Sequence, residues 1–60
     1  MTYAAAFHFA CLASQYTLTD DELLAALRMA RAQHPGEAVS LAAIERAVTN
    51  VLAAREALAA

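Results

Sequence analysis

The chain has 60 residues and a net charge of −2, with four arginines, no lysine and six acidic residues. This balance excludes the basic patch typical of nucleic-acid-binding proteins, and no apolar run approaches the roughly 20 residues of a membrane span. Hydrophobic residues make up 62% of the chain, which excludes disorder, but 18 of these 37 residues are alanine, so only 19 larger side chains can build a core.

The first predicted element is a helix over about residues 3–15. Thr2 can cap it, and the alanines at positions 4, 5, 6 and 10 favour a helix over a strand. Apolar residues lie almost all round this helix, with Tyr3 and Phe7 on one side and Phe9 on the other. A helix of this kind is buried on more than one face. Because a three-helix monomer cannot cover all of it, we expect a second subunit or a partner to do so.

The second predicted helix, about residues 20–34, has the clearest start. Thr19 and Glu22 form a capping box, in which each side chain can bind the backbone amide of the other residue. The three acidic residues of the first turn also suit the helix dipole. The adjacent Pro35 and Gly36 are expected to end this helix.

The second helix has one clear apolar stripe at helical spacing. Its members are Leu23, Ala26, Leu27, Ala30 and His34, and Leu24 widens it. Met29 lies away from this stripe. We interpret Met29 either as a single exposed apolar side chain, which is ordinary, or as a flexible contact for a second subunit.

The third predicted helix covers about residues 41–59, with Ser40 as its N-cap. Its apolar stripe has the spacing of heptad a and d positions and comprises Leu41, Ile44, Val48, Val51, Leu52 and Leu58. Arg55 falls in an a position of this stripe. We predict an antiparallel hairpin of the second and third helices, in which Arg55 pairs with Asp20 or Asp21. The alternative is that Arg55 extends past the shorter helix into water.

The rear of the third helix carries a strip of small residues. It comprises Ala43, Ala47, Asn50, Ala54 and Ala57. Small residues let two helices approach closely, and a central Asn can fix their register, which predicts an interface here. The alternative is that these alanines fill a solvated face.

No pattern in the sequence indicates an enzyme, and we expect no catalytic residue, no cofactor and no metal. His8 and Cys11 are close enough on a helix to touch, but nothing near them would orient the histidine as a base. We therefore expect Cys11 to be a buried structural thiol. One cysteine also excludes an intramolecular disulfide, and two histidines give no zinc-ligand pattern. A domain this small then needs a protein partner for stability.

The predicted fold is all-α, a single small domain over residues 1–60 with three helices, packed as a homodimer. We expect a non-enzymatic protein-interaction module in the cytoplasm, a regulator or inhibitor that masks a surface on another protein such as a transcription factor. Its partners are itself and that protein, without nucleic acid or membrane. The expected interface residues are Phe7, Phe9, Leu12, Tyr16, Met29, Ala43, Ala47, Asn50, Ala54 and Arg55.

Two alternatives belong to other functional classes. Residues 39–46 resemble the start of a recognition helix, which implies a dimeric helix-turn-helix DNA-binding regulator that uses Arg28, Arg31 and Arg46. The apolar first helix is also compatible with a processed or membrane-attached small protein, although no Lys or Arg of the kind that starts a signal peptide precedes the apolar run over residues 3–13.

Overall fold

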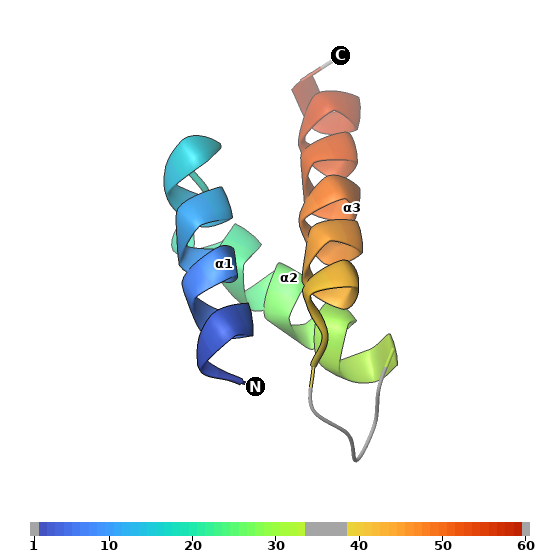
Figure 1. Ribbon diagram of the computed structural model, residues 1–60. Helices are drawn as coiled ribbons and strands as arrows, with labels where there is room; N and C mark the ends of the chain where they lie inside the picture. Colours follow the sequence, from blue (N-terminus) through green and yellow to red (C-terminus); the bar gives the residue numbers. More distant parts are fainter. Residues whose placement is uncertain (1, 34–38, 60) are drawn as a thin grey trace.

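The computed structural model describes residues 2–33 and 39–59, and every regular element in these ranges is a helix (Figure 1). The helices are α1 (Tyr3–Gln15), α2 (Asp20–Gln33) and α3 (Leu41–Ala59). The predicted all-α class with three helices is therefore confirmed. His34, where the second helix was expected to end, and the break at Pro35 and Gly36 lie outside the described residues.

Each helix begins at a side-chain cap that the sequence predicts. Thr2 and Ser40 each accept a hydrogen bond from the amide three residues later, at 3.1 Å in both cases. Before α2 the Glu22 amide donates to the Thr19 hydroxyl at 3.2 Å, and the Thr19 amide donates to the Glu22 carboxylate at 2.8 Å. These bonds satisfy amides that have no partner within the first turn of a helix. The capping box is confirmed.

The end of α1 is a tight turn that leads the chain into α2. The Leu18 amide donates to the Ala13 carbonyl at 3.0 Å, and the Thr17 amide donates to the Ser14 carbonyl at 3.3 Å. This pair of bonds is a Schellman motif, whose left-handed position is usually glycine. Here Thr17 takes that position with φ of 50°, which is strained for a β-branched residue.

Both α1 and α2 pack on α3. In Figure 1, α1 and α3 stand upright on either side, and α2 runs obliquely across the space between them. The buried core comprises Ala5, Ala26, Ala30, Val39, Ala43, Ile44, Ala47, Val48 and Val51. Five of these nine residues are alanine, and the largest fully buried side chain is Ile44. The helices therefore meet mainly through small side chains.

The predicted sides of α2 and α3 need two corrections. Ala43 and Ala47 are 0% and 1% exposed, so they belong to the core and not to an outer strip, whereas Asn50 and Ala54 are exposed. Met29 is half-buried and packs on the core rather than away from it. The physical reason is that α3 contacts two helices. Its buried surface is therefore wider than a single heptad stripe.

Candidate protein-interaction surface

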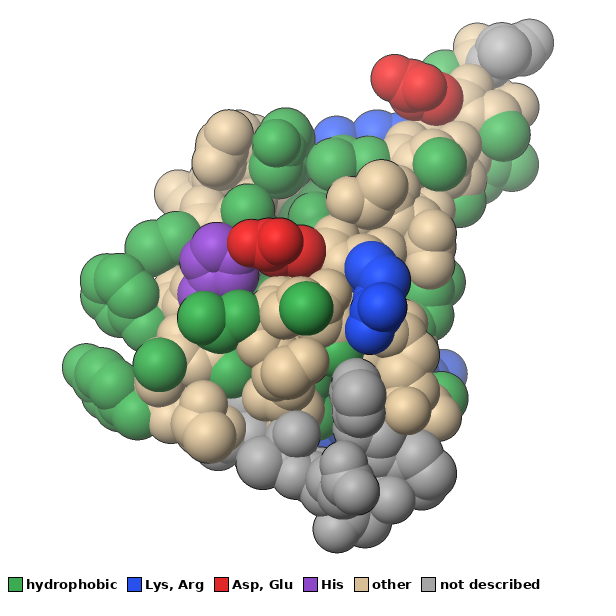
Figure 2. Space-filling model, turned by 45° about the vertical axis from the view of Figure 1, so that its right-hand side comes forward, with side chains coloured by type: hydrophobic (Ala, Val, Ile, Leu, Met, Phe, Trp, Pro, Cys, Tyr) green, Lys and Arg blue, Asp and Glu red, His purple; other side chains and the backbone are tan. Residues whose placement is uncertain are grey.

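The helix α1 turns one side to the core and the other to solvent. Ala5 is 1% exposed, and Phe9 and Leu12 pack on the core at the helical spacing that follows it. On the opposite side Tyr3 is 86% exposed and Phe7 is 63% exposed. Figure 2 shows hydrophobic side chains standing out at the edge of the molecule. The prediction that α1 has more apolar surface than the single chain covers agrees with these exposures.

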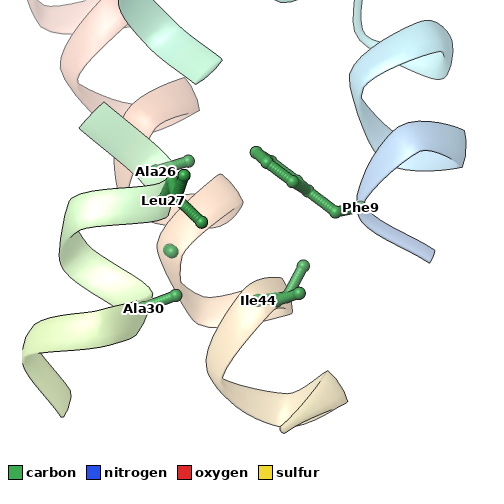
Figure 3. A pocket seen from close by; sticks show the side chains of 6 residues that line it. Phe9, Ala26, Leu27, Ala30 and Ile44 are labelled. Atoms are coloured by element: carbon green, nitrogen blue, oxygen red, sulfur yellow. The ribbon is translucent and has the colours of Figure 1, made fainter. Parts of the chain in front are cut away.

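Phe9 sets the rotation of α1 about its own axis. Its ring points from α1 toward the other two helices (Figure 3). The apolar pocket around it is lined by Ala26, Leu27 and Ala30 of α2 and by Ile44 and Ala47 of α3. The pocket has no room for a water molecule. Phe9 is therefore part of the packing of the single chain, and the opposite side of α1 faces outward.

A polar contact also joins α1 to α3. His8 Nε2 lies 3.0 Å from the Glu45 carboxylate, and the two side chains are 34% and 62% exposed. His8 is thus directed to α3 and not to Cys11. Cys11 is a free, exposed cysteine. The expectation that Cys11 is buried is wrong, because it lies on the outward side of α1.

Arg55 joins the turn between α1 and α2 to α3. Its Nη1 donates to the Tyr16 carbonyl at 3.1 Å, and its Nη2 donates to the Thr17 carbonyl at 3.3 Å. Its Nε and Nη2 also donate to the two Glu22 oxygens at 2.7 and 2.6 Å. One guanidinium therefore holds the strained turn and the start of α2 together through planar, two-point recognition of a carboxylate.

The prediction that Arg55 pairs with Asp20 or Asp21 is wrong, although its actual partner lies in the same first turn of α2. Arg55 pairs with Glu22, whereas Asp20 and Asp21 are exposed. Glu22 lies one helical turn before the buried Ala26, so both lie on the side of α2 that faces α3. In the sequence, the capping box alone explained why Glu22 stands at this position. The second contact of Glu22, with Arg55, appears only in the tertiary structure.

The Glu22 carboxylate has an altered acidity. The hydrogen bonds from Arg55 and from the Thr19 amide lower the pKa of Glu22 from 4.5 to about 2. The same contact raises the pKa of Arg55. The Glu22 side chain is 19% exposed and that of Arg55 is 39% exposed, so the pair is shielded from water only in part.

The structure separates the predicted interface residues into three groups. Phe7, Tyr16, Asn50 and Ala54 are exposed, Phe9, Leu12, Met29 and Arg55 are partly buried, and Ala43 and Ala47 are buried. They do not form one surface. The residues that do share a surface are on the outward side of α1: Tyr3, Phe7, Ala10, Cys11 and Ser14. The predicted interface set omitted Tyr3, although its spacing of four residues from Phe7 places both on one side.

Neither a group of metal ligands nor a membrane-spanning helix occurs in the described part of the chain. In residues 2–33 and 39–59, no group of three or more His, Cys, Asp or Glu side chains could hold a metal ion. No helix within the same ranges is long and apolar enough to cross a membrane. Arg28, Arg31 and Arg46 are exposed. Comparisons of the chain with protein-family models, with curated proteins and with solved structures found no match.

Proposed function

We propose that this protein is a non-enzymatic interaction module of the cytoplasm, a homodimer that regulates or inhibits another protein by masking part of its surface. One observation carries the proposal: the smallest apolar side chains are inside and several of the largest are outside. Five of the nine core residues are alanine, whereas Tyr3, Phe7 and Leu58 are 86%, 63% and 90% exposed. Exposed apolar surface of this kind is typical of a site where another protein binds.

The outward side of α1 is held ready for binding. Phe9 sits between α2 and α3, His8 contacts Glu45, and Arg55 holds the end of α1. A surface that is already rigid loses little conformational entropy when a partner docks on it. These contacts support the outward side of α1 as a binding surface.

The proposed scaffold for this surface is an antiparallel hairpin of α2 and α3. Arg55, late in α3, contacts Glu22 at the start of α2. Ile44, early in α3, lines the same pocket as Ala30 from late in α2. Contacts of this order are those of two helices that run in opposite directions, which supports the hairpin.

Two sets of exposed apolar side chains suit the two proposed partners. One set is the outward side of α1, and the other is the exposed leucines Leu24, Leu41 and Leu58 of α2 and α3. If the first set joins the two copies of the homodimer, the leucines remain for the regulated protein.

Affinity capture from the native host tests this function. The tagged full-length chain is compared with Leu24→Ser/Leu58→Ser and with a control, Ala53→Ser, which changes an exposed residue of α3. We expect mass spectrometry to identify one protein that the wild type and the control recover and that the leucine variant loses. Recovery of the same proteins by all three chains, or of none, contradicts the proposal.

A further inference from the structure

We propose that two copies of this chain pair antiparallel through the outward side of α1, so that Phe7 of each copy lies against Ala10 of the other and Tyr3 against Ser14. This pairing rests on the proposed function, and it names the surface that the homodimer uses. Among the described residues, the other large apolar side chains that are exposed are Tyr16, just after α1, and Leu24, Leu41 and Leu58, which come from other helices or opposite ends of one helix.

The outward residues of α1 have the spacing of a two-helix seam. Tyr3, Phe7, Ala10 and Ser14 are separated by four, three and four residues, which is the alternation of d and a positions in a heptad. All four are exposed. The residues that pack α1 on its own core, Ala5, Phe9 and Leu12, fall at other heptad positions. A partner helix can therefore use this seam without disturbing the fold.

The order of side-chain sizes along the seam favours antiparallel pairing of two copies. The two aromatic residues come first and the two small residues last. In a parallel pair, rings would oppose rings at one end and leave a gap at the other. Reversal of one copy places each large side chain against a small one, which fills the interface evenly. The seam is thus complementary to itself about a two-fold axis, and such an assembly closes at two copies.

The absence of Asp, Glu, Lys and Arg from α1 also favours a second copy of the chain as the partner. No Asp, Glu, Lys or Arg occurs between Tyr3 and Gln15. Residues near a two-fold axis meet their own copies, so any charge there would face a like charge. A partner with a charged groove would leave its charges unpaired against this side of α1. Antiparallel helices also place opposite dipole ends together.

The available area is enough for a small specific interface. Tyr3 and Phe7 are 86% and 63% exposed, so aromatic side chains of about 150–250 Å² each bring roughly 220–370 Å² per copy. In two copies these rings bring about half to three quarters of the roughly 1,000 Å² that a specific interface needs. The exposed Ala4, Ala6 and Cys11 border the seam and add to this area. We therefore expect a reversible dimer.

The single cysteine makes the helix orientation measurable. Cys11 and Ala4 lie on one flank of the seam, and Ala6 lies on the other. In an antiparallel pair a flank meets its own copy, which brings Cys11 near Ala4 of the other chain. In a parallel pair opposite flanks meet, which brings Cys11 near Ala6. Within one helix, neither position can form a disulfide with Cys11, because Cα atoms seven or five residues apart exceed the limit of about 7 Å.

Cross-linking of two matched variants tests the pairing. Ala4→Cys and Ala6→Cys are made in the full-length chain, both at exposed positions of α1, and are oxidised at micromolar concentration. We expect Ala4→Cys to form disulfide-linked dimers at least tenfold faster than Ala6→Cys or the wild type, with a bond between positions 4 and 11. Equal or faster cross-linking of Ala6→Cys, or none above the wild type, overturns the antiparallel pairing.

Sedimentation separates failure of this pairing from failure of the proposed function. Phe7→Glu should move the chain from dimer to the 6.3 kDa monomer with an unchanged helical spectrum, and Leu24→Glu, at an exposed leucine of α2, should not. Tyr3→Ser provides a milder second variant at the same surface. A dimer that resists both Phe7→Glu and Tyr3→Ser overturns the α1 pairing but leaves the function in place. The proposed function is tested independently by the affinity capture, in which the Leu24→Ser/Leu58→Ser variant is expected to lose the captured protein.

Discussion

At the scale of single residues, Glu22 has two partners for one carboxylate. It closes the capping box with Thr19 and receives the guanidinium of Arg55 from α3. The cap fixes where α2 begins, and the ion pair fixes that start against α3. Both contacts favour the charged form of Glu22, which explains why its pKa falls to about 2.

This lowered pKa predicts a loss of stability in acid. A carboxylate whose pKa is lower in the folded chain contributes stability that is complete above its unfolded value, 4.5, and is lost as the pH falls toward about 2. We expect the thermal midpoint of the wild type to fall over this range, and that of Glu22→Gln to fall much less. Asp21→Asn, in the same helical turn, serves as the control and should follow the wild type. Parallel profiles for the wild type and Glu22→Gln would contradict the role of Glu22.

Thr17 is the strained residue of the turn before α2, with φ of 50°. Thr17→Gly should relieve roughly 1–3 kcal/mol of backbone strain. Glycine also has greater conformational freedom in the unfolded chain, which should destabilise the folded protein by up to about 1 kcal/mol. We expect a net gain near 1 kcal/mol in chemical denaturation. Thr17→Ala keeps the Cβ atom and should gain less, so equal effects of the two variants would show that the turn is not strained.

At the scale of the helices, alanine decides how closely they pack. Ala26 and Ala30 of α2 and Ala43 and Ala47 of α3 are at most 2% exposed. A larger side chain at such a position pushes helices apart, because the space around it is already filled. Ala54, by contrast, is exposed, so its size does not limit how closely the helices approach.

A matched pair of substitutions on α3 tests this packing. Ala47→Leu should lower the free energy of unfolding by about 1–3 kcal/mol, the usual cost of overfilling a core. Ala57→Leu changes an exposed position of the same helix and should stay within about 0.5 kcal/mol of the wild type. Urea denaturation measures both. Equal effects at the two positions would mean that Ala47 is not in a tight contact.

At the scale of the whole molecule, the buried core is built from small side chains, while several large apolar side chains remain exposed to solvent. Ile44 is the largest fully buried side chain, while Tyr3, Phe7 and Leu58 remain more than half exposed. Small domains with little buried volume commonly gain further stability from disulfides, metals or assembly. Stability and binding are then linked, because a partner that binds only the folded chain stabilises it.

This linkage predicts that stability depends on protein concentration. The thermal midpoint of the wild type should rise as the chain concentration is raised a hundredfold, because the proposed dimer would form only from folded chains. The midpoint of Phe7→Glu should stay constant over the same range. Scanning calorimetry of both proteins provides the measurement, and a wild-type midpoint that does not move with concentration would indicate a stable monomer.

The sequence predicted the local structure well because the signals that define it act within one or two turns. The hydroxyls of Thr2, Thr19 and Ser40 cap amides three residues later, so the helix starts could be predicted from spacing alone. The excess of apolar residues on α1 was also visible in the sequence. The candidate site was predicted only in part: Phe7 lies on the outward side of α1, but Ala43 and Ala47 are in the core.

By itself the sequence determined three capped helices and an excess of apolar surface, because capping, helix propensity and composition need no knowledge of how helices cross. Only the tertiary structure decided which sides are covered. Alanine is small enough to suit either a core or a surface, so a row of alanines does not show which way it faces. The pairing of Arg55 with Glu22 rather than Asp20 or Asp21 likewise depends on how α2 is rotated against α3. Such packing joins side chains distant in sequence, as in the pocket that Phe9 of α1 shares with residues of α2 and α3.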